Sequence, residues 1–363
     1  MRDERAPLEC WVSAMHVVDT HRHPLGEGPQ RILARIGAYD PNAPLPQATR
    51  GNVFYAEWLD EAATVPGGQE GGVTKAVLSN GGEVEFWAQL SGGDVRSTLV
   101  MLLEDKLGLK ERHPGVFEIM VDAHPFDETC RDFLDEGLDG HGAKAISVAT
   151  SWGDGAERRF LDDPACEWLW ELATARDVVV HLHPPMLPLG HEVQVPYRLA
   201  EVVGRPCDTA LTVARMIYSG TFDRHPHLKV VTVHTGGAVP ALIGRLEFGW
   251  RLNFHGVADR SQVAAWEDRN ELPPSEYLRR NIWADTMGLS ASCVRHAIEI
   301  YGIDHILFGT DYGPVPISPR EHVEMVLDLG LSEDDQQKIF WGNADRLFKL
   351  GLGKAADSSA TSA

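Results

Sequence analysis

The feature that most constrains the fold is a repeated alternation of short apolar runs with longer stretches of helical period. Most of the apolar runs are rich in Val and Ile, which is typical of parallel strands covered on both faces. The eight predicted strands are Met15–Asp19, Val73–Leu78, Val116–Val121, Ala143–Ala149, Val178–His183, Lys229–His234, Asn281–Ala284 and His305–Gly309. Helices are predicted between them, at Asp163–Ala175, Asp208–Ser219, Val239–Trp250 and Ser292–Tyr301. Eight such units indicate an α/β protein with a closed (β/α)8 TIM barrel. A doubly wound open sheet is the alternative, but no GxGxxG follows the first strand.

The domain organisation follows from this pattern. We interpret residues 1–352 as a single barrel domain, because barrels of this kind commonly exceed about 250 residues. Two segments are additional to a minimal barrel: residues 24–72, rich in Pro, Gly and Asn with a possible helix at Val53–Ala63, and residues 91–109, predicted to form an extra helix. Since long ordered loops often act as lids, we expect both insertions to lie over the barrel mouth. Residues 353–363 are small and polar, and we expect a disordered tail.

The charge balance and the cysteines restrict the class of partner. The chain has 33 basic and 53 acidic side chains, for a net charge of −20. This acidity disfavours binding to a nucleic-acid backbone and to anionic membranes. No apolar run approaches the ~20 residues of a membrane span, and the N-terminus does not resemble a signal peptide. The cysteines are scattered, which suits a reducing compartment: Cys10, Cys130, Cys166, Cys207 and Cys293. We therefore expect a cytoplasmic enzyme with a small-molecule substrate.

Two histidines lie two residues apart at the end of the first predicted strand. They are His21 and His23, in the sequence VVDTHRHP. Because alternate residues of a strand point to the same side, both imidazoles can face the barrel interior at its mouth. Two neutral imidazoles on one face suit a metal such as Zn²⁺. The alternative is that one of them caps the strand or packs in a loop.

Three further strand ends carry residues of the same chemical type. The fifth strand ends in VVVHLHPP with His181 and His183, the sixth in VVTVHTGG with His234, and the eighth in ILFGTDYGP with Asp311. The carboxyl ends of barrel strands converge on one cavity, so these side chains are expected to meet. Each one alone could be a hydrogen-bonded loop or core residue. Their recurrence at four strand ends favours a metal site.

With these motifs in place, the sequence resembles the amidohydrolase superfamily, in particular its aminocarboxymuconate semialdehyde decarboxylase-like branch. The resemblance runs from about Val17 to about Leu350 and is densest in the second half of the chain. That branch has HxH on the first strand, His-Pro after the fifth, His-x-Gly-Gly after the sixth and Gly-Thr-Asp after the eighth. This sequence contains all four motifs.

The resemblance implies a role for each matching position. His21, His23, His183 and Asp311 correspond to the metal ligands, and His234 corresponds to the acid/base histidine beside the metal. If the reaction is a hydrolysis, either Asp311 or His234 is the base. Some decarboxylases of the branch carry glutamate where this chain has His21. The metal implied is one divalent ion, for which we expect Zn²⁺, with Mn²⁺ as the alternative.

Other residues are open to two interpretations. Arg245 follows the His234 motif and either holds a substrate carboxylate or structures its loop. Trp152 follows the fourth strand and either lines an aromatic pocket for a planar substrate or packs in the core. His181 is expected to support its strand. Lys144, on the fourth strand, is expected to be structural, because it precedes the strand end.

The favoured function is metal-dependent, non-oxidative decarboxylation of a small unsaturated or aromatic carboxylic acid. Hydrolysis of an amide, a lactone or a C–C bond needs the same metal ligands and remains the alternative enzyme function. A binding protein that retains the barrel without turnover is a hypothesis from a different class, against which the intact set of motifs argues. The resemblance also implies a possible homodimer.

Overall fold

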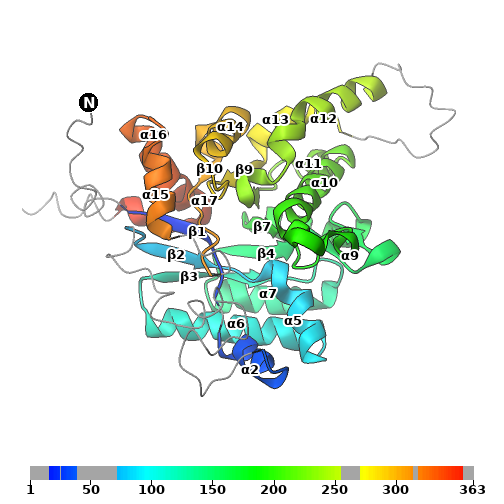
Figure 1. Ribbon diagram of the computed structural model, residues 1–363, viewed down its shortest axis with the longest axis vertical. Coiled ribbons are helices and arrows are strands. Elements are labelled where there is room, and N and C mark those ends of the chain that lie inside the picture. Colours follow the sequence, from blue (N-terminus) through cyan, green and yellow to red (C-terminus); the bar gives the residue numbers. More distant parts are fainter. Residues whose placement is uncertain (1–15, 25, 39–71, 255–269, 314–317, 355–363) are drawn as a thin grey trace, which may run out of the picture.

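The computed structural model describes residues 16–24, 26–38, 72–254, 270–313 and 318–354 (Figure 1). Its main sheet has eight strands in the order β1-β2-β3-β4-β7-β8-β9-β10, and neighbouring strands pair in parallel. The strands are β1 (Val18–Arg22), β2 (Lys75–Leu78), β3 (Phe117–Asp122), β4 (Ala145–Ala149), β7 (Val179–His183), β8 (Val230–Thr232), β9 (Ile282–Asp285) and β10 (Ile306–Leu307). Each overlaps one of the eight predicted strands.

The last strand returns to the first and closes the sheet. The Thr20 amide donates to the Phe308 carbonyl at 2.9 Å, and the Asp311 amide donates to the His21 carbonyl at 2.8 Å. A parallel bridge between Arg22 and Tyr312 continues this pairing. The predicted (β/α)8 TIM barrel is therefore confirmed. Because β10 has two ladder residues, the loop after it, rather than the strand, makes most of the closing contacts.

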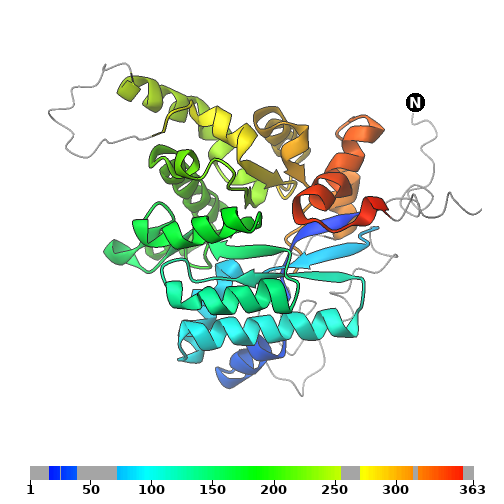
Figure 2. The ribbon, with the colours of Figure 1, turned by 180° about the vertical axis from the view of Figure 1, so that it is seen from behind.

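Helices surround the strands on the outside, as the two opposite views show (Figures 1 and 2). They are α2 (Glu27–Arg35), α5 (Val84–Ser91), α6 (Val95–Arg112), α7 (Arg131–Asp135), α8 (Glu167–Ala175), α9 (His191–Gln194), α10 (Arg205–Tyr218), α11 (Thr221–Arg224), α12 (Val239–Phe254), α13 (Pro274–Arg280), α14 (Ala291–Tyr301), α15 (Pro319–Leu327), α16 (Glu333–Gln337) and α17 (Asn343–Phe348). The four helices predicted between strands correspond to α8, α10, α12 and α14. A short antiparallel hairpin of β5 (Ser151–Trp152) and β6 (Arg159–Phe160), which the sequence did not predict, follows β4.

The two predicted insertions are placed in part. The second, residues 91–109, forms most of α6, whose Leu99, Leu102 and Lys106 are buried. This helix packs along β3 on the outside of the barrel. The sequence pattern had instead predicted a position above the mouth. Within the first insertion, 24–72, helix α2 packs on α5 and α6. The possible helix at Val53–Ala63 and the tail after Lys354 lie outside the described residues.

The two larger of the three apolar clusters in the described residues lie on the two faces of the strands. The larger one fills the space between the strands and the helices, with side chains such as Val17, Ile146, Val213 and Val294. The smaller one lies inside one end of the barrel. Its members come from seven of the strands and from α17: Val18, Val77, Met120, Ala145, Val179, Val231, Leu307, Ala344, Leu347 and Phe348. The barrel is therefore packed inside as well as outside.

Two further observations concern the expected environment. None of the described helices has the combination of length and apolar character that crossing a membrane would require. The described cysteines, Cys130, Cys166, Cys207 and Cys293, are free thiols.

Candidate metal centre and active site

Four side chains meet inside the mouth of the barrel. His21 lies on β1, His23 follows it, His183 ends β7, and Asp311 follows β10. One ligand atom from each lies within 4.8 Å of all the others, and all four residues are buried. The structure therefore brings together the same four residues that the motifs select as metal ligands.

An irregularity in the first strand makes this convergence possible. Val18 faces the apolar cluster inside the barrel. Strict alternation from Val18 would turn Thr20 inward and His21 outward. The pairing of β1 with β2 shifts register between Asp19 and Arg22, which resets the alternation. His21 and His23 consequently both face the interior.

The outer ring nitrogen of each imidazole is held by an acceptor. His21 Nδ1 lies 2.7 Å from Asp285 Oδ2, and His23 Nδ1 lies 3.0 Å from the Ser79 carbonyl. His183 Nδ1 lies 2.7 Å from the Pro184 carbonyl. Because these oxygens only accept, each Nδ1 carries the proton and each Nε2 presents a lone pair to the centre.

These inward nitrogens fit a metal ion. His21 Nε2 and His23 Nε2 are 3.2 Å apart, so their lone pairs repel unless a cation lies near them. His183 Nε2 is buried and makes no hydrogen bond. Asp311 Oδ1 lies 3.4 Å from His21 Nε2 and 3.1 Å from His23 Nε2. Three imidazoles and one carboxylate are a ligand set that binds divalent transition metals.

The electrostatics of the cluster also favour a cation. Burial by itself lowers the pKa of His23, but hydrogen bonds to Asp311 and Glu83 raise it to about 10. Burial, followed by the charges of His23 and His21, holds the pKa of His183 well below its usual value. Burial by itself raises the pKa of Asp311, but the neighbouring histidines, His21 first, hold that pKa well below its usual value. Positive charge is thus stabilised at His23, where a bound metal ion would take the place of the proton.

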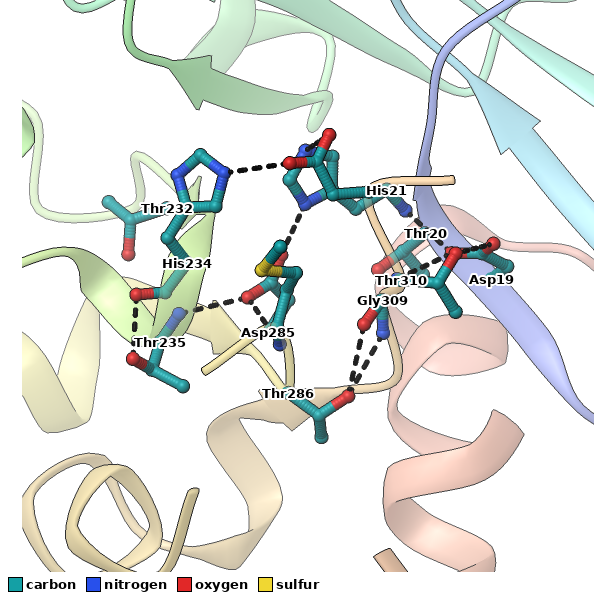
Figure 3. Close-up of polar contacts among 12 residues, drawn as sticks. Asp19, Thr20, His21, Thr232, His234, Thr235, Asp285, Thr286, Gly309 and Thr310 are labelled. Carbon is teal, nitrogen blue, oxygen red and sulfur yellow. Dashed lines mark hydrogen bonds and ion pairs between the residues drawn. The ribbon is translucent and has the colours of Figure 1, made fainter. Parts of the chain in front are cut away.

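Asp285 connects His21 with the turn that carries His234 (Figure 3). Besides His21, it accepts hydrogen bonds from the backbone amides of Thr235 at 2.9 Å and Met287 at 3.0 Å. Burial opposes ionisation, yet the hydrogen bond and charge of His21 lower the pKa of Asp285. Sequence reasoning did not select this residue. Its signal was available, because Asp285 ends the seventh strand in IWAD just as the other site residues end theirs.

His234 lies beside the ligand cluster. Its Nε2 is 3.2 Å from Asp311 Oδ2, and its side chain is 15% exposed. His234 and Thr235 have φ values of 57° and 56°, an unfavourable conformation for residues with a Cβ. The hydrogen bond from the Thr235 amide to Asp285 supports this turn. The structure therefore holds His234 within reach of a group bound at the cluster and partly open to solvent.

The glycine of the Gly-Thr-Asp motif, Gly309, is required for steric reasons. An ideal Cβ at Gly309 would lie 2.9 Å from the Cβ atoms of both His21 and Asp285. Only glycine lets the loop after β10 approach β1 this closely. Thr310 then fixes the loop, since its amide and its hydroxyl donate to Asp19 at 3.1 Å and 2.6 Å. This is the geometry that presents Asp311 to the histidines.

A second buried carboxylate supports His23. Glu83 Oε1 lies 3.1 Å from His23 Nδ1, and Glu83 Oε2 accepts from Trp87 Nε1 at 2.8 Å and Asn80 Nδ2 at 3.1 Å. The backbone amide of Asn80 donates to Asp122 Oδ1. The other oxygen of this carboxylate pairs with the buried amine of Lys106 at 2.5 Å. The sequence GGEVEF around Glu83 carries no signal for this role, because the contact depends on how α5 and β1 pack.

Neither predicted substrate residue makes a hydrogen bond, ion pair or ring contact with the cluster in the described part of the chain. Trp152, in β5, is 4% exposed and belongs to the main core, with its ring 4.5 Å from the ring of His124. Arg245 is exposed on α12, and within the described residues it makes no hydrogen bond or ion pair. His181 is buried with its ring 6.0 Å from that of His21. Lys144 immediately precedes β4, at the end of the strand opposite to the mouth.

Comparison with protein-family models matches residues 18–350 to the amidohydrolase family. The chain belongs to this family. The resemblance inferred from the sequence is thereby confirmed, and relatives from the expected branch are also found. This amidohydrolase is 30% identical over 203 residues to the 2-amino-3-carboxymuconate-6-semialdehyde decarboxylase of Dictyostelium discoideum, an alignment of 55% of this chain and 52% of that protein. It is 31% identical over 198 residues to the gamma-resorcylate decarboxylase of a Polaromonas species, over 52% and 56% of the two chains. The chain thus spans about half the length of the curated relatives it matches.

Solved structures share the fold over nearly the whole length of this amidohydrolase. The dihydroxybenzoic acid decarboxylase of Polaromonas, crystallised with manganese and 2-nitroresorcinol, aligns with a TM-score of 0.70 and 21% identity over 94% of this chain and 98% of that one. The 5-carboxyvanillate decarboxylase of Novosphingobium aromaticivorans, also with manganese, aligns with a TM-score of 0.71 and 18% identity over 93% and 96%. At these identities the likeness establishes the fold.

Proposed function

We propose that this amidohydrolase is a metal-dependent, non-oxidative decarboxylase of a small aromatic or unsaturated carboxylic acid. The observation that carries the proposal is the convergence of three imidazole Nε2 atoms and Asp311 within 4.8 Å, with His234 beside them. The relatives named above support it, because both are decarboxylases by name. The ligand roles of His21, His23, His183 and Asp311 are part of this proposal.

Each group at the site has a separate role in the proposed reaction. When bound, the divalent metal supplies Lewis-acid stabilisation of negative charge on substrate oxygens. His234 exchanges a proton with the substrate, because its Nε2 faces the cluster and an imidazole can both donate and accept a proton. The carbon that bears the carboxylate takes up this proton, the bond to the carboxyl carbon breaks, and CO₂ leaves. Asp311, 3.2 Å from His234 Nε2, orients the ring and stabilises its protonated form.

Zinc is the metal that the imidazole-rich ligand set predicts. Manganese is the alternative, and two of the similar structures contain it. We propose one ion for each chain, since Lys144 lies at the opposite end of its strand and adds no ligand for a second.

A second copy of this chain is the proposed partner. Apolar side chains are exposed along the segment after β7 and on α12: Val193, Val195, Tyr197, Val202, Val203 and Phe248. Large exposed apolar side chains mark interaction sites where they gather in one patch. Arg245 is exposed on the same helix as Phe248 and makes no hydrogen bond or ion pair within the described residues, so we propose that it contacts the substrate carboxylate of a partner subunit. A cytoplasmic location stays a prediction, consistent with the free thiols.

The test begins with metal content. Wild type and His183→Ala are purified identically and analysed by mass spectrometry. We expect close to one equivalent of zinc or manganese in wild type and a loss of more than about 100-fold in metal affinity in the variant, because an inner ligand matters more than the outer contacts that give 10–100-fold. Two equivalents would contradict the mononuclear site.

The reaction is then assayed with the metal-loaded protein. A panel of hydroxybenzoic and unsaturated carboxylic acids is monitored for CO₂ release, and a parallel panel of amides and lactones for hydrolysis. Release of CO₂ that depends on His183 supports the decarboxylase. Hydrolysis without CO₂ release would replace it with the alternative enzyme function, for which the same ligands suffice and Asp311 or His234 is the base.

A further inference from the structure

The first turn of α10 lies between the loops that carry His183 and His234. The Pro206 carbonyl accepts from the Ala238 amide at 3.0 Å, next to the turn of His234. On its other side, Arg205 contacts Met186, three residues after His183, through Nη2 and Sδ at 3.3 Å. The Met186 amide donates to the Gly82 carbonyl at 3.1 Å, and Gly82 packs directly against the His183 ring. Arg205 thus lies at the barrel mouth between two residues of the proposed site.

The guanidinium of Arg205 is not satisfied by the protein. Its Nε is buried and makes no hydrogen bond, and its one hydrogen bond within the described part of the chain goes to a thioether sulfur, a weak acceptor. No carboxylate among the described residues pairs with it, although the chain has 53 acidic side chains. A cationic group with unmet donors costs free energy, which an anionic ligand can offset.

Two arginines with buried side chains differ from Arg205, which is half-buried, although the Nε of one of them, Arg158, is likewise without a hydrogen bond. Arg158, whose side chain is 3% exposed, donates to Ser151 Oγ at 2.7 Å and to the Leu187 carbonyl at 2.8 Å. Arg22, also 3% exposed, lies 3.4 Å from an Asp19 carboxylate oxygen. Both have oxygen acceptors that explain their positions structurally. Arg205 has no oxygen acceptor in the described part of the chain, so the comparison points to an acceptor from outside it.

We propose that Arg205 binds a second acidic group of the substrate, so that the substrate is a dicarboxylic acid or a related dianion. This inference rests on the proposed function, because it takes the ligand cluster to hold the reacting end of the substrate. A carboxylate matches the planar guanidinium, which binds it in a bidentate way. Arg205 is then a specificity-determining residue that selects substrates with an acidic group remote from the metal.

The test is equilibrium binding by calorimetry to the metal-loaded protein. The probes are phthalate, isophthalate and terephthalate, compared with benzoate, which has one carboxylate. We expect at least one dicarboxylate to bind about 10-fold or more tightly than benzoate. Arg205→Met should weaken that dicarboxylate about 10- to 100-fold, as for the loss of a charged hydrogen bond, and leave benzoate within about twofold. Arg205→Lys should restore part of the affinity.

Two controls separate the possible failures. Arg295→Met removes the same charge from an exposed position on α14 and should change neither affinity. Far-ultraviolet circular dichroism and the Tm establish that Arg205→Met is folded. Equal losses for benzoate and dicarboxylate, or no preference for a dicarboxylate in wild type, would overturn the inference. If metal binding and CO₂ release persist in that case, the proposed function stands without it. Absence of both metal and acid binding overturns the two together.

Discussion

The two ends of the barrel are built from the same strands, but their side chains are apolar at one end and polar at the other. At one end the strands contribute Val18, Val77, Met120 and Val179 to an apolar cluster closed by α17. At the mouth several of the barrel strands end in imidazoles and carboxylates, and some of their polar atoms, His183 Nε2 among them, have no hydrogen-bond partner among the described residues. The apolar packing at the closed end therefore stabilises the fold, whereas the polar groups at the mouth carry the chemistry.

This division has an energetic consequence. Apolar burial at the closed end stabilises the fold by about 25 cal/mol for each Å² removed from water. The mouth instead concentrates repelling lone pairs and buried charges, which are unfavourable until a ligand occupies them. Substitutions at the mouth should therefore change catalysis and metal binding, whereas substitutions at the closed end should change the free energy of unfolding.

The largest effect is expected on catalysis at the mouth. His234→Asn removes the group that moves the proton, and kcat for the substrate found by CO₂ release should fall about 10²- to 10⁴-fold. The metal content should stay at the wild-type value, because His234 is outside the ligand set. Steady-state kinetics with metal analysis checks this. Loss of the metal together with activity would show that His234 is a ligand.

At the closed end, the expected effect is on stability. Phe348 is 2% exposed and packs into the inner cluster at the end of α17. Phe348→Ala should lower the free energy of unfolding by about 3–5 kcal/mol, since it removes apolar contacts and leaves a cavity. Urea denaturation measures this. The folded variant should retain metal, and a metal-free folded variant would contradict the independence of the two ends.

A smaller effect is expected from an outer contact of the mouth. Asp285→Asn removes the charge that holds His21 Nδ1 at 2.7 Å, so metal affinity should fall about 10- to 100-fold. Competition with a chelator of known affinity gives the dissociation constant. Asp177→Asn, the same chemical change at the opposite rim, is the matched control and should leave metal affinity unchanged. Unaltered affinity in Asp285→Asn would remove that residue from the site.

The smallest effect is electrostatic and lies at the rim of the closed end. Asp177, before β7, pairs with Lys229 and with Lys349, and these hydrogen bonds lower its pKa. A lowered pKa in the folded state means that the contribution is present above the unfolded value of about 3.9 and is lost as the pH falls through the folded value. Asp177 is 56% exposed, so solvent screening keeps this contribution below about 1 kcal/mol.

The measurement is urea denaturation of wild type and Asp177→Asn between pH 7 and pH 3. The difference in free energy of unfolding should be small at pH 7, shrink towards zero at the acidic end, and shrink also with added salt. A difference that grows as the pH falls would contradict the assigned sign.

Much of the fold was predictable because strand identity depends on local composition. Runs such as Val178–His183 are rich in β-branched residues, and the chain distance between them leaves room for a helix. Helix α6 was also predicted from the sequence, but its position beside β3 was not. Whether a helix covers a strand or a mouth depends on long-range packing of residues such as Leu102, which a pattern along the chain does not contain.

Which strand ends meet at the mouth could be predicted from the sequence. Parallel strands of a barrel place their carboxyl ends together, so the positions of His21, His183 and Asp311 along the chain predicted their convergence, and the family resemblance selected His183 rather than His181. How these side chains are held depends on the tertiary structure. The register shift in β1 turns His21 inward, Asp285 and Glu83 fix the outer ring nitrogens, and Arg205 has no oxygen acceptor among the described residues. Such contacts join residues far apart in the chain, and their geometry arises from packing rather than from local sequence.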